Sequence, residues 1–319
     1  MSNLFIDLAH RGKNSWWRYA IGMVFSLLML MAVGSAVSLG LLSLYVATDN
    51  NPLTKMASPE VMEAGKGIVV GVSPLIEYVG GNVAFLLFLL GIWLSVKLLH
   101  KRGLVSLITP YARISWKRVA QGFWVFFVLI FLEIMVSYAL SPQDYTLSFQ
   151  LVPFLLFLPL VFLITPLQTT TEELFFRGYL LQGIGTRFGK WTAAILTSLL
   201  FASLHFANPE VAGQSGFEAQ VSIVLHFVML AAFLAWLTLK DNTLELAIGV
   251  HAANNIAAFL FVTGDADVTV VQSPAIFTTS KIEASFASLF LMALALIIFS
   301  FVVFRMMKRP MLPVASQEP

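Results

Sequence analysis

A series of long apolar stretches limits the fold of this chain more than any other feature. A helix needs about 20 mostly apolar residues to cross the hydrocarbon core of a bilayer. Charged residues make up only 11% of the 319 positions, whereas soluble domains carry about 25%. We therefore predict an all-α polytopic membrane protein with about eight transmembrane helices in one bundle. The predicted spans cover residues 19–46, 82–100, 119–140, 150–185, 191–206, 219–239, 244–262 and 284–305.

The segments between and after these spans carry other signals. Residues 47–81 are rich in Asn, Pro, Gly and Ser, a composition that favours an extramembrane loop. The tail from Lys308 to Pro319 contains three prolines and no apolar period, so we expect it to be disordered. Pro166 is expected to interrupt the over-long fourth span, and the fifth span is short.

The distribution of Lys and Arg predicts the orientation, because these residues concentrate in cytoplasmic loops. With the N-terminus inside, 16 of the 19 Lys and Arg residues fall in inner segments, and only Lys55, Lys66 and Lys281 fall outside. We therefore predict an integral, multi-pass protein with both termini cytoplasmic. No small-residue cleavage site follows the first basic residues, so the first span is interpreted as uncleaved and not as a signal peptide.

Several classes of chemistry are excluded by what the sequence lacks. The chain has no cysteine, which excludes disulfides, thiolate catalysis and Cys-based metal sites. No basic run suggests binding to nucleic acid. The metalloprotease pattern H-E-x-x-H and the serine-nucleophile pattern G-x-S-x-G are absent, and so is the G-x-G-D of intramembrane aspartyl proteases.

Polar residues gather in three motifs inside the spans. A charged group at the centre of a transmembrane helix costs about 2.5 to 3.5 kcal/mol on insertion scales, so such groups usually face the bundle interior and mark function. Glu173 and Arg177 stand at i and i+4 in the order that favours an ion pair, and Glu172 is left without an obvious partner. The motifs are EELFFR (Glu172 to Arg177), FASLH (Phe201 to His205) and HAANN (His251 to Asn255).

The motifs fall at a common depth. Counting at about 1.5 Å per residue from the basic residues that end each helix places Glu172, His205, His251 and Asn255 about 16 to 23 Å from the cytoplasmic side. Residues on three helices that reach one level meet the requirement for a shared site. The sequence therefore predicts an intramembrane polar site.

Each motif also has a structural interpretation. Glu172 and Glu173 each follow a threonine by three residues, which matches a capping box at a helix start. A lone intramembrane histidine can be a hydrogen-bonded packing element, and Phe201 is expected to pack against His205. Glu133 and His226 lie near the same level but lack a motif partner, so we expect structural pairing for both. Capping does not explain Arg177 or the distant histidines.

The residues of the three motifs suit the hydrolysis of an amide. Glu172, held in an apolar site, suits a general base for water, and His205 could share the proton and orient that water. His251 and Asn255 offer two donors on one helix face, which suit an oxyanion hole. These groups require neither a covalent intermediate nor a metal.

The motif series E-E-x-x-x-R, F-x-x-x-H and H-x-x-x-N resembles the CPBP family of intramembrane proteases, which contains the type II CAAX prenyl endopeptidases and the bacteriocin-processing and immunity proteins. The resemblance covers roughly residues 150 to 265. It implies an intramembrane glutamic endopeptidase in which Glu172 and His205 activate water and His251 and Asn255 hold the oxyanion. Glu173, Arg177 and Phe201 would have supporting roles, with no cofactor or metal.

The resemblance also implies an organisation and a setting. Residues 1–149 would form an N-terminal region of three spans, residues 150–265 the catalytic core of spans four to seven, and residues 266–319 the last span and a cytoplasmic tail. The substrate would be a membrane-associated or lipidated protein or peptide, and the location the cell membrane of a prokaryote. The oligomeric state is left open.

Three other functions are compatible with parts of this pattern. Glu172, His205 and His251 could form a two-histidine, one-carboxylate metal site of a metal-dependent protease. The chain could instead be a non-catalytic immunity or surface-display factor, although a scaffold does not need an unpaired carboxylate in lipid. A transporter could relay protons through Glu and His, but no inverted repeat is visible.

Overall fold

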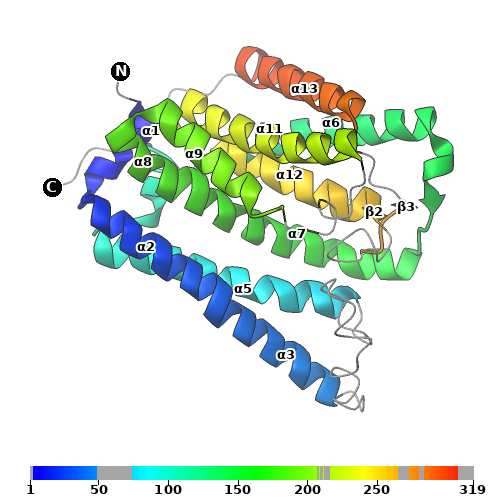
Figure 1. Cartoon of the computed structure of the whole chain (residues 1–319), viewed down its shortest axis with the longest axis horizontal. Coiled ribbons are helices and arrows are strands. Elements are labelled where there is room, and N and C mark those ends of the chain that lie inside the picture. The colour runs from blue at the N-terminus through cyan, green and yellow to red at the C-terminus, as the bar shows by residue number, and fades with distance from the viewer. Residues whose placement is uncertain are drawn as a thin grey trace.

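The computed structural model describes residues 3–48, 74–206, 208, 211, 216–264, 273–279 and 284–307. These residues form a bundle of helices with one small sheet (Figure 1). The expected disordered tail, 308–319, lies outside the described residues. The bundle contains the α-helices α1 (Leu4–Asp7), α2 (Trp16–Leu28), α3 (Ser35–Thr48), α5 (Pro74–Leu94), α6 (Trp116–Leu140), α7 (Leu151–Glu173), α8 (Leu181–Phe188), α9 (Lys190–Ser203), α11 (Phe217–Asp241), α12 (Glu245–Phe261) and α13 (Phe286–Phe301).

Shorter helical segments join or extend these helices. Four of the described ones are π-helical, and each of those continues a long helix without a break: η2 (Met29–Gly34), η4 (Ser95–Leu99), η7 (Leu174–Leu180) and η8 (Val302–Met306). The others are 3-10 turns: η1 (Leu8–Arg11), η5 (Leu104–Leu107) and η6 (Pro142–Asp144).

Six of the described helices are long and apolar enough to cross a membrane. Two further predicted spans, 191–206 and 244–262, correspond to α9 and α12, which are shorter helices of 14 and 17 residues. The prediction of an all-α, multi-pass membrane protein is confirmed. The six long helices are Trp16–Leu44, Tyr78–Leu99, Trp116–Leu140, Leu151–Phe188, Phe217–Asp241 and Phe286–Met306.

Two predicted boundaries are wrong. Both ends of the predicted loop 47–81 are helical, because α3 continues to Thr48 and α5 already begins at Pro74; residues 49–73 lie outside the described part. Pro166 does not interrupt its helix, since α7 runs through it to Glu173. A proline removes only one backbone hydrogen bond, and packing against neighbouring helices, here α5 and α12, makes this tolerable in a membrane bundle.

The helix is irregular after Glu173 and not at the proline. In η7 the backbone widens, and the N–H of Leu181 bonds the carbonyl of Phe176, five residues earlier. On its outer side Gly178 lies against η5, where an added Cβ would come within 3.0 Å of the Leu107 carbonyl oxygen. Single π-helical turns inside α-helices are frequent at functional sites.

Helix α12, which carries the HAANN motif, lies between α6, α7 and α11. Small residues allow this close approach. A Cβ added at Gly249 would lie 2.2 Å from the Val119 carbonyl oxygen, and one added at Gly122 would lie 2.6 Å from that of Leu246. Small residues at such crossings let two backbones pack directly in a membrane bundle. The motif is therefore held at the centre of the bundle.

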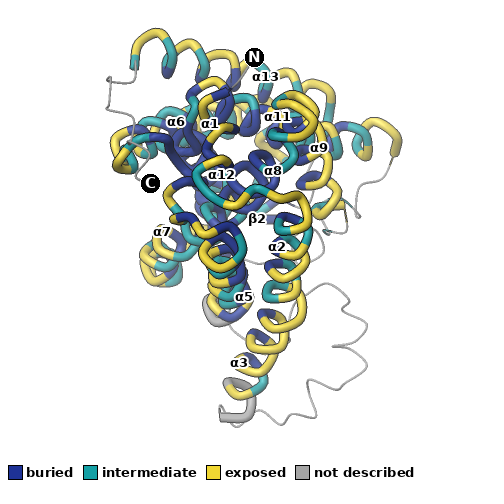
Figure 2. Tube along the Cα trace, turned by 90° about the vertical axis from the view of Figure 1, so that its left-hand side faces the viewer, coloured by how far each residue is buried: buried dark blue, intermediate teal, exposed yellow. Residues whose placement is uncertain are grey.

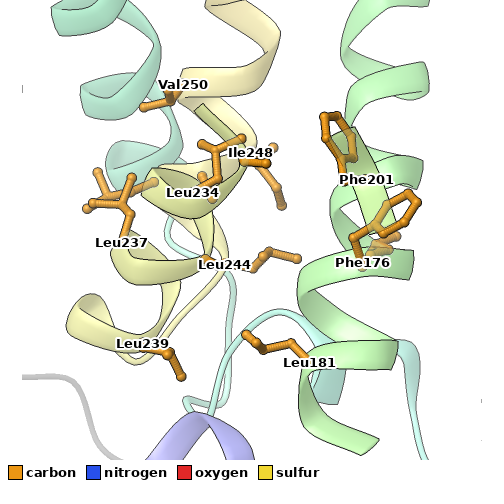
Figure 3. Packing of buried hydrophobic residues seen from close by; sticks show 14 of the residues in the cluster. Phe176, Leu181, Phe201, Leu234, Leu237, Leu239, Leu244, Ile248 and Val250 are labelled. Atoms are coloured by element: carbon orange, nitrogen blue, oxygen red, sulfur yellow. The ribbon is translucent and has the colours of Figure 1, made fainter. Parts of the chain in front are cut away.

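The main apolar core joins η7 and α8 to α9, α11 and α12. Phe176 and Phe201 meet edge to face with ring centroids 5.1 Å apart, and Figure 3 shows both rings on the same side of the core, across from Ile248. Buried residues concentrate in the middle of the bundle, whereas α3 is mostly exposed (Figure 2). Exposed apolar residues on the outside of a membrane bundle are expected to face lipid.

A small sheet joins the loop before α7 to the segment after α12. Strands β1 (Thr146–Leu147), β3 (Phe277–Thr279) and β2 (Val262–Gly264) lie in that order, with β1 antiparallel and β2 parallel to β3. Thr278 pairs with Thr146 on one side and with Thr263 on the other. The sequence did not predict these strands, because two or three residues leave no readable alternation.

Both ends of the described chain lie at one end of the bundle. Arg118 donates to the carbonyl of Met307 (2.6 Å), and its guanidinium pairs with Asp241 (2.8 Å). Asn3 donates to the carbonyl of Leu239 (3.0 Å). We call this end the basic end, because it collects Arg11, Lys13, Arg18, Lys97, Lys101, Arg102, Arg113, Lys117, Arg118, Arg187, Lys190, Lys240 and Arg305.

Candidate active site

The predicted pair of Glu173 and Arg177 is present and completely buried. Nη1 of Arg177 donates to Oε1 of Glu173 over 2.8 Å, and both side chains are 0% exposed. Nη2 of Arg177 donates to the carbonyl of Ala231 on α11 (3.2 Å). The guanidinium also lies 4.3 Å from the ring centroid of Phe201 on α9, a cation–π contact. The pair therefore binds three helices together.

His251 lies between the two carboxylates of the first motif. Its Nδ1 is 2.8 Å from Oε1 of Glu173, and its Nε2 is 3.5 Å from Oε2 of Glu172. An ionised carboxylate can only accept a hydrogen bond, so Nδ1 carries the hydrogen toward Glu173. This leaves Nε2 directed at Glu172.

Glu172 is the most accessible charged group of the site, with 12% of its side chain exposed. The sequence suggested that Glu172 has no partner, and this is wrong. Gln168 donates to its Oε1 (3.4 Å), and His251 lies beside its Oε2. It also does not cap a helix. Helix α7 begins at Leu151, so both glutamates stand at its C-terminal end, and the capping interpretation is wrong.

His205 lies just beyond the end of α9, in the turn that follows Ser203. Its Nδ1 is 2.9 Å from the carbonyl of Phe201, so Nδ1 donates there. Its ring packs against Phe201 as predicted (centroids 4.6 Å apart) and stacks on Phe227 of α11 (4.8 Å). Within the described residues His205 has no hydrogen bond to Glu172 or His251, and the Phe201 ring also contacts His251 (5.7 Å).

Asn255 follows His251 by four residues on α12. Nδ2 of Asn254 donates to its Oδ1 (3.1 Å), so the carbonyl half of the Asn255 amide is engaged and its NH2 group remains a donor. Asn254 and Gln168 are two site residues that we did not predict. Gln168 stands four residues before Glu172, a spacing that could have revealed it.

The charges of the site do not balance with arginine alone. Arg177 supplies one positive charge against the carboxylates of Glu172 and Glu173. The only other described group within ion-pair distance of either carboxylate is His251. Oε2 of Glu173 and Nε of Arg177 are buried and have no hydrogen-bond partner within the described residues. One oxygen of Glu173 is therefore fixed by both Arg177 and His251, whereas the carboxylate of Glu172 remains partly accessible.

Glu133 on α6 and His226 on α11 take no part in this cluster. The structural pairing expected for them is not found within the described residues. The nearest ring to His226 is Phe227, with centroids 6.3 Å apart. The described residues also contain no group of three or more His, Asp or Glu side chains with the geometry of a metal site.

These features define a class of protein: a multi-pass membrane protein whose interior holds an ion-paired glutamate, a second glutamate and a histidine. Residues 151–257 match the family described as type II CAAX prenyl endopeptidase Rce1-like. The chain is also 28% identical over 292 residues to the uncharacterized protein YyaK of Bacillus subtilis (strain 168), which covers 90% of this chain and 91% of that protein. No solved structure gives a significant match.

The matched range contains all three motifs, and the resemblance to the CPBP family is thereby confirmed. In general terms the match supports a CAAX-type intramembrane protease.

Proposed function

We propose that this protein is an intramembrane glutamic endopeptidase that hydrolyses a peptide bond of a membrane-associated or lipidated substrate. The observation that carries the proposal is the position of His251, 2.8 Å from Glu173 and 3.5 Å from Glu172. One carboxylate, neutralised by Arg177, fixes the imidazole. The other is left free to react.

Glu172 is the proposed general base. It is more exposed than Glu173, and it can act as the base when neither its carboxylate nor Nε2 of His251 carries the proton. A water that approaches Glu172 gives its proton to the carboxylate while its oxygen attacks the substrate carbonyl carbon. General base catalysis of this kind typically contributes about 100- to 10,000-fold.

His251 has a different role in this proposal from the one that the sequence suggested. Because its Nδ1 donates to Glu173, its Nε2 can share the proton that Glu172 receives. The same proton then passes to the leaving amine nitrogen as the C–N bond breaks. A carboxylate that fixes the tautomer of a catalytic histidine is a recurring device, and Glu173 is the positioning residue here.

Asn255 and His205 complete the proposed site. The NH2 group of Asn255, oriented by Asn254, is the donor that stabilises the oxyanion of the tetrahedral intermediate. Nδ1 of His205 donates to the Phe201 carbonyl, so its Nε2 is the ring nitrogen that would accept a hydrogen bond from the attacking water.

The setting is part of the proposal. We place the basic end in the cytoplasm, so that both termini are cytoplasmic, because Lys and Arg concentrate on that side of membrane proteins. Residues 150–265 form the catalytic core, and residues 1–149 and 266–319 flank it. The YyaK relative in Bacillus subtilis favours the cell membrane of a prokaryote.

The test uses the purified protein in detergent and quenched fluorescent peptides that end in Cys-a-a-X, with and without a farnesyl group. Glu172→Gln should lower turnover by about 100- to 10,000-fold. It should leave abundance and the unfolding temperature unchanged, since glutamine has the same shape. Glu133→Gln is the matched control, a second intramembrane glutamate outside the cluster, and should keep full turnover.

Other results would favour the rival functions. Full turnover in a normally folded Glu172→Gln protein rejects the mechanism. Loss of wild-type activity in a chelator, restored by zinc, would indicate a metal-dependent protease. A wild-type protein that cleaves none of the peptides would favour a non-catalytic immunity or surface-display factor.

A further inference from the structure

The N-terminal segment, residues 3–18, is a packed part of the fold. It lies against the basic end of the bundle, where Phe5 and Leu8 are fully buried or nearly so. Ile6 contacts α8 so closely that a Cβ added at Gly185 would lie 2.6 Å from its Cδ1. This segment carries no catalytic motif, so we looked for a role in the contacts that it makes with the helices of the site.

His100, which follows η4, joins this segment to η7. Its Nδ1 donates to the carbonyl of Lys13 (2.8 Å), and its backbone carbonyl accepts from the Lys13 N–H (2.8 Å). Its Nε2 lies 2.9 Å from the hydroxyl of Tyr179. Burial lowers the pKa of His100 to about 4, so the ring is neutral at neutral pH and Nε2 can only accept. The single hydrogen of the Tyr179 hydroxyl is shared between this nitrogen and the carbonyl of Arg18.

Tyr179 is the η7 residue that receives this contact. Its hydroxyl is also 3.1 Å from the carbonyl of Arg18, at the end of the N-terminal segment. The ring centroid of Tyr179 lies 5.1 Å from that of Tyr19, and the ring centroid of Tyr19 lies 4.3 Å from that of His100. The hydroxyl is therefore enclosed by three aromatic or polar groups from outside the helix that bears it.

The same short segment reaches the catalytic cluster at its other end. Glu173 immediately precedes η7, and Arg177 lies inside it, two residues before Tyr179. The Tyr179 ring is parallel to that of Phe175 (6.4 Å), which packs on Phe176, and Phe176 packs on Phe201. A π-helical turn is rare in isolation and is kept where surrounding contacts hold it.

We propose that Tyr179 and His100 are positioning residues: through their hydrogen bond, the N-terminal segment fixes the π-helical turn η7 and hence the geometry of Glu173, Arg177 and His251. The inference rests on the proposed function for its catalytic consequence. It gives the first part of the chain a role in the reaction, although none of that part touches the reacting atoms.

The first test is Tyr179→Phe, which removes only the hydroxyl. We expect kcat to fall by about five- to tenfold, the effect of one hydrogen bond on the barrier, with KM within twofold. Hydrogen exchange of the amides of Leu174–Leu180, measured in detergent by mass spectrometry, should become faster because η7 is held less firmly.

The matched control is Asn3→Ala. It loosens only the start of the N-terminal segment, because Asn3 bonds the Leu239 carbonyl and caps α1 through Phe5 and Ile6, and it leaves the contacts of Lys13 and Arg18 with His100 and Tyr179 in place. It should lower the unfolding temperature at least as much as Tyr179→Phe, with unchanged kcat and unchanged exchange in η7. Equal effects of the two variants on kcat and on exchange would reduce Tyr179 to a stability residue and overturn the proposal.

A second variant pushes the hydroxyl instead of removing it. A Cβ added at Gly22 on α2 would lie 2.1 Å from the Tyr179 hydroxyl oxygen, so Gly22→Ala must displace the tyrosine ring. We expect kcat to fall more than in Tyr179→Phe. In the double variant Gly22→Ala, Tyr179→Phe the closest contact is gone, although Cζ of the ring (3.0 Å) and Cβ of Ser95 (3.1 Å) stay near the added Cβ, so kcat should recover toward the level of Tyr179→Phe alone. Additive losses would overturn the proposal.

The exchange measurement separates this inference from the proposed function. If the wild-type protein cleaves no peptide, exchange alone decides. Faster exchange of Leu174–Leu180 in Tyr179→Phe but not in Asn3→Ala upholds the control of η7 through the contacts of Tyr179 with His100 and Arg18. Unchanged exchange in Tyr179→Phe rejects it, whether or not the protein is a protease.

Discussion

Two buried arginine–carboxylate pairs in this bundle look alike in distance and differ in everything around them. At the basic end, Arg118 meets Asp241 at 2.8 Å, and Gln121 and the carbonyl of Met307 accept from its Nη1. In the interior, Arg177 meets Glu173 at the same distance. Around Arg118 the acceptors come from the ends of three helices. Around Glu173 stand a second carboxylate and an imidazole.

The difference indicates what each pair does. A buried ion pair is often no more stabilising than apolar side chains of similar volume, so stability alone does not explain the interior pair. Around Arg118 the described groups hydrogen-bond helix ends, and the second carboxylate there, Glu245, is fully buried and accepts from the Ser115 N–H and the Thr243 hydroxyl. Around Glu173 the pair holds His251 in one tautomer and leaves Glu172 beside it, 12% exposed. The pair of Arg118 and Asp241 joins helix ends, and the pair of Glu173 and Arg177 orients the side chains of the candidate active site.

Removing each arginine in turn tests whether the two ion pairs have different roles. Arg118→Ala and Arg177→Ala should both destabilise the protein by about 3 to 5 kcal/mol, because each removes the cation that neutralises a buried carboxylate. Only Arg177→Ala should also reduce turnover per folded molecule. The check is the unfolding temperature and abundance of both variants, with kcat measured on the folded fraction. Equal kcat in the two folded fractions would make the interior pair as structural as the other.

The interior pair could be predicted because it is local. Glu173 and Arg177 are four residues apart on one helix, so spacing and charge order suffice. The apolar spans were equally readable, since length and hydropathy determine them. The depth count brought Glu172 and His251 to one level, which agrees with their 3.5 Å contact.

Depth gives the height of a residue in the bundle and not the direction in which its side chain points. The sequence therefore could not show that His251 faces both carboxylates, nor that the Phe201 carbonyl takes Nδ1 of His205. The π-helical turn η7 was also invisible, because its hydrogen-bond shift leaves no periodic pattern over seven residues. Contacts between helices, such as that of His100 with Tyr179, depend on packing that no local spacing records.

Asn255 tests the proposed oxyanion donor of the interior site. Asn255→Ala should lower kcat by about 100- to 1,000-fold, equivalent to about 2.7 to 4 kcal/mol, and leave KM within a few fold, because an oxyanion donor acts mainly after the carbonyl becomes tetrahedral. Asn254→Ala, which only releases the Asn255 amide, should cost less. A raised KM with unchanged kcat in Asn255→Ala would assign the amide to substrate binding instead.

The stability of the basic end should depend on pH through His100. Burial, with smaller contributions from the nearby Arg102 and Arg18, lowers the pKa of His100 to about 4, although the hydrogen bond to the Lys13 carbonyl opposes the shift. The unfolded chain takes up this proton near pH 6.5. His100 therefore stabilises the fold fully above about pH 6.5, and this contribution is lost as the pH falls toward 4, by on the order of 3 kcal/mol.

The measurement is the unfolding temperature of the wild type, His100→Gln and His10→Gln between pH 7 and pH 4. His10 is exposed, so its variant should follow the wild-type curve. His100→Gln should be less stable at pH 7 and lose less on acidification, because the titrating group is gone. If all three curves fall in parallel, the loss of stability in acid does not come from His100.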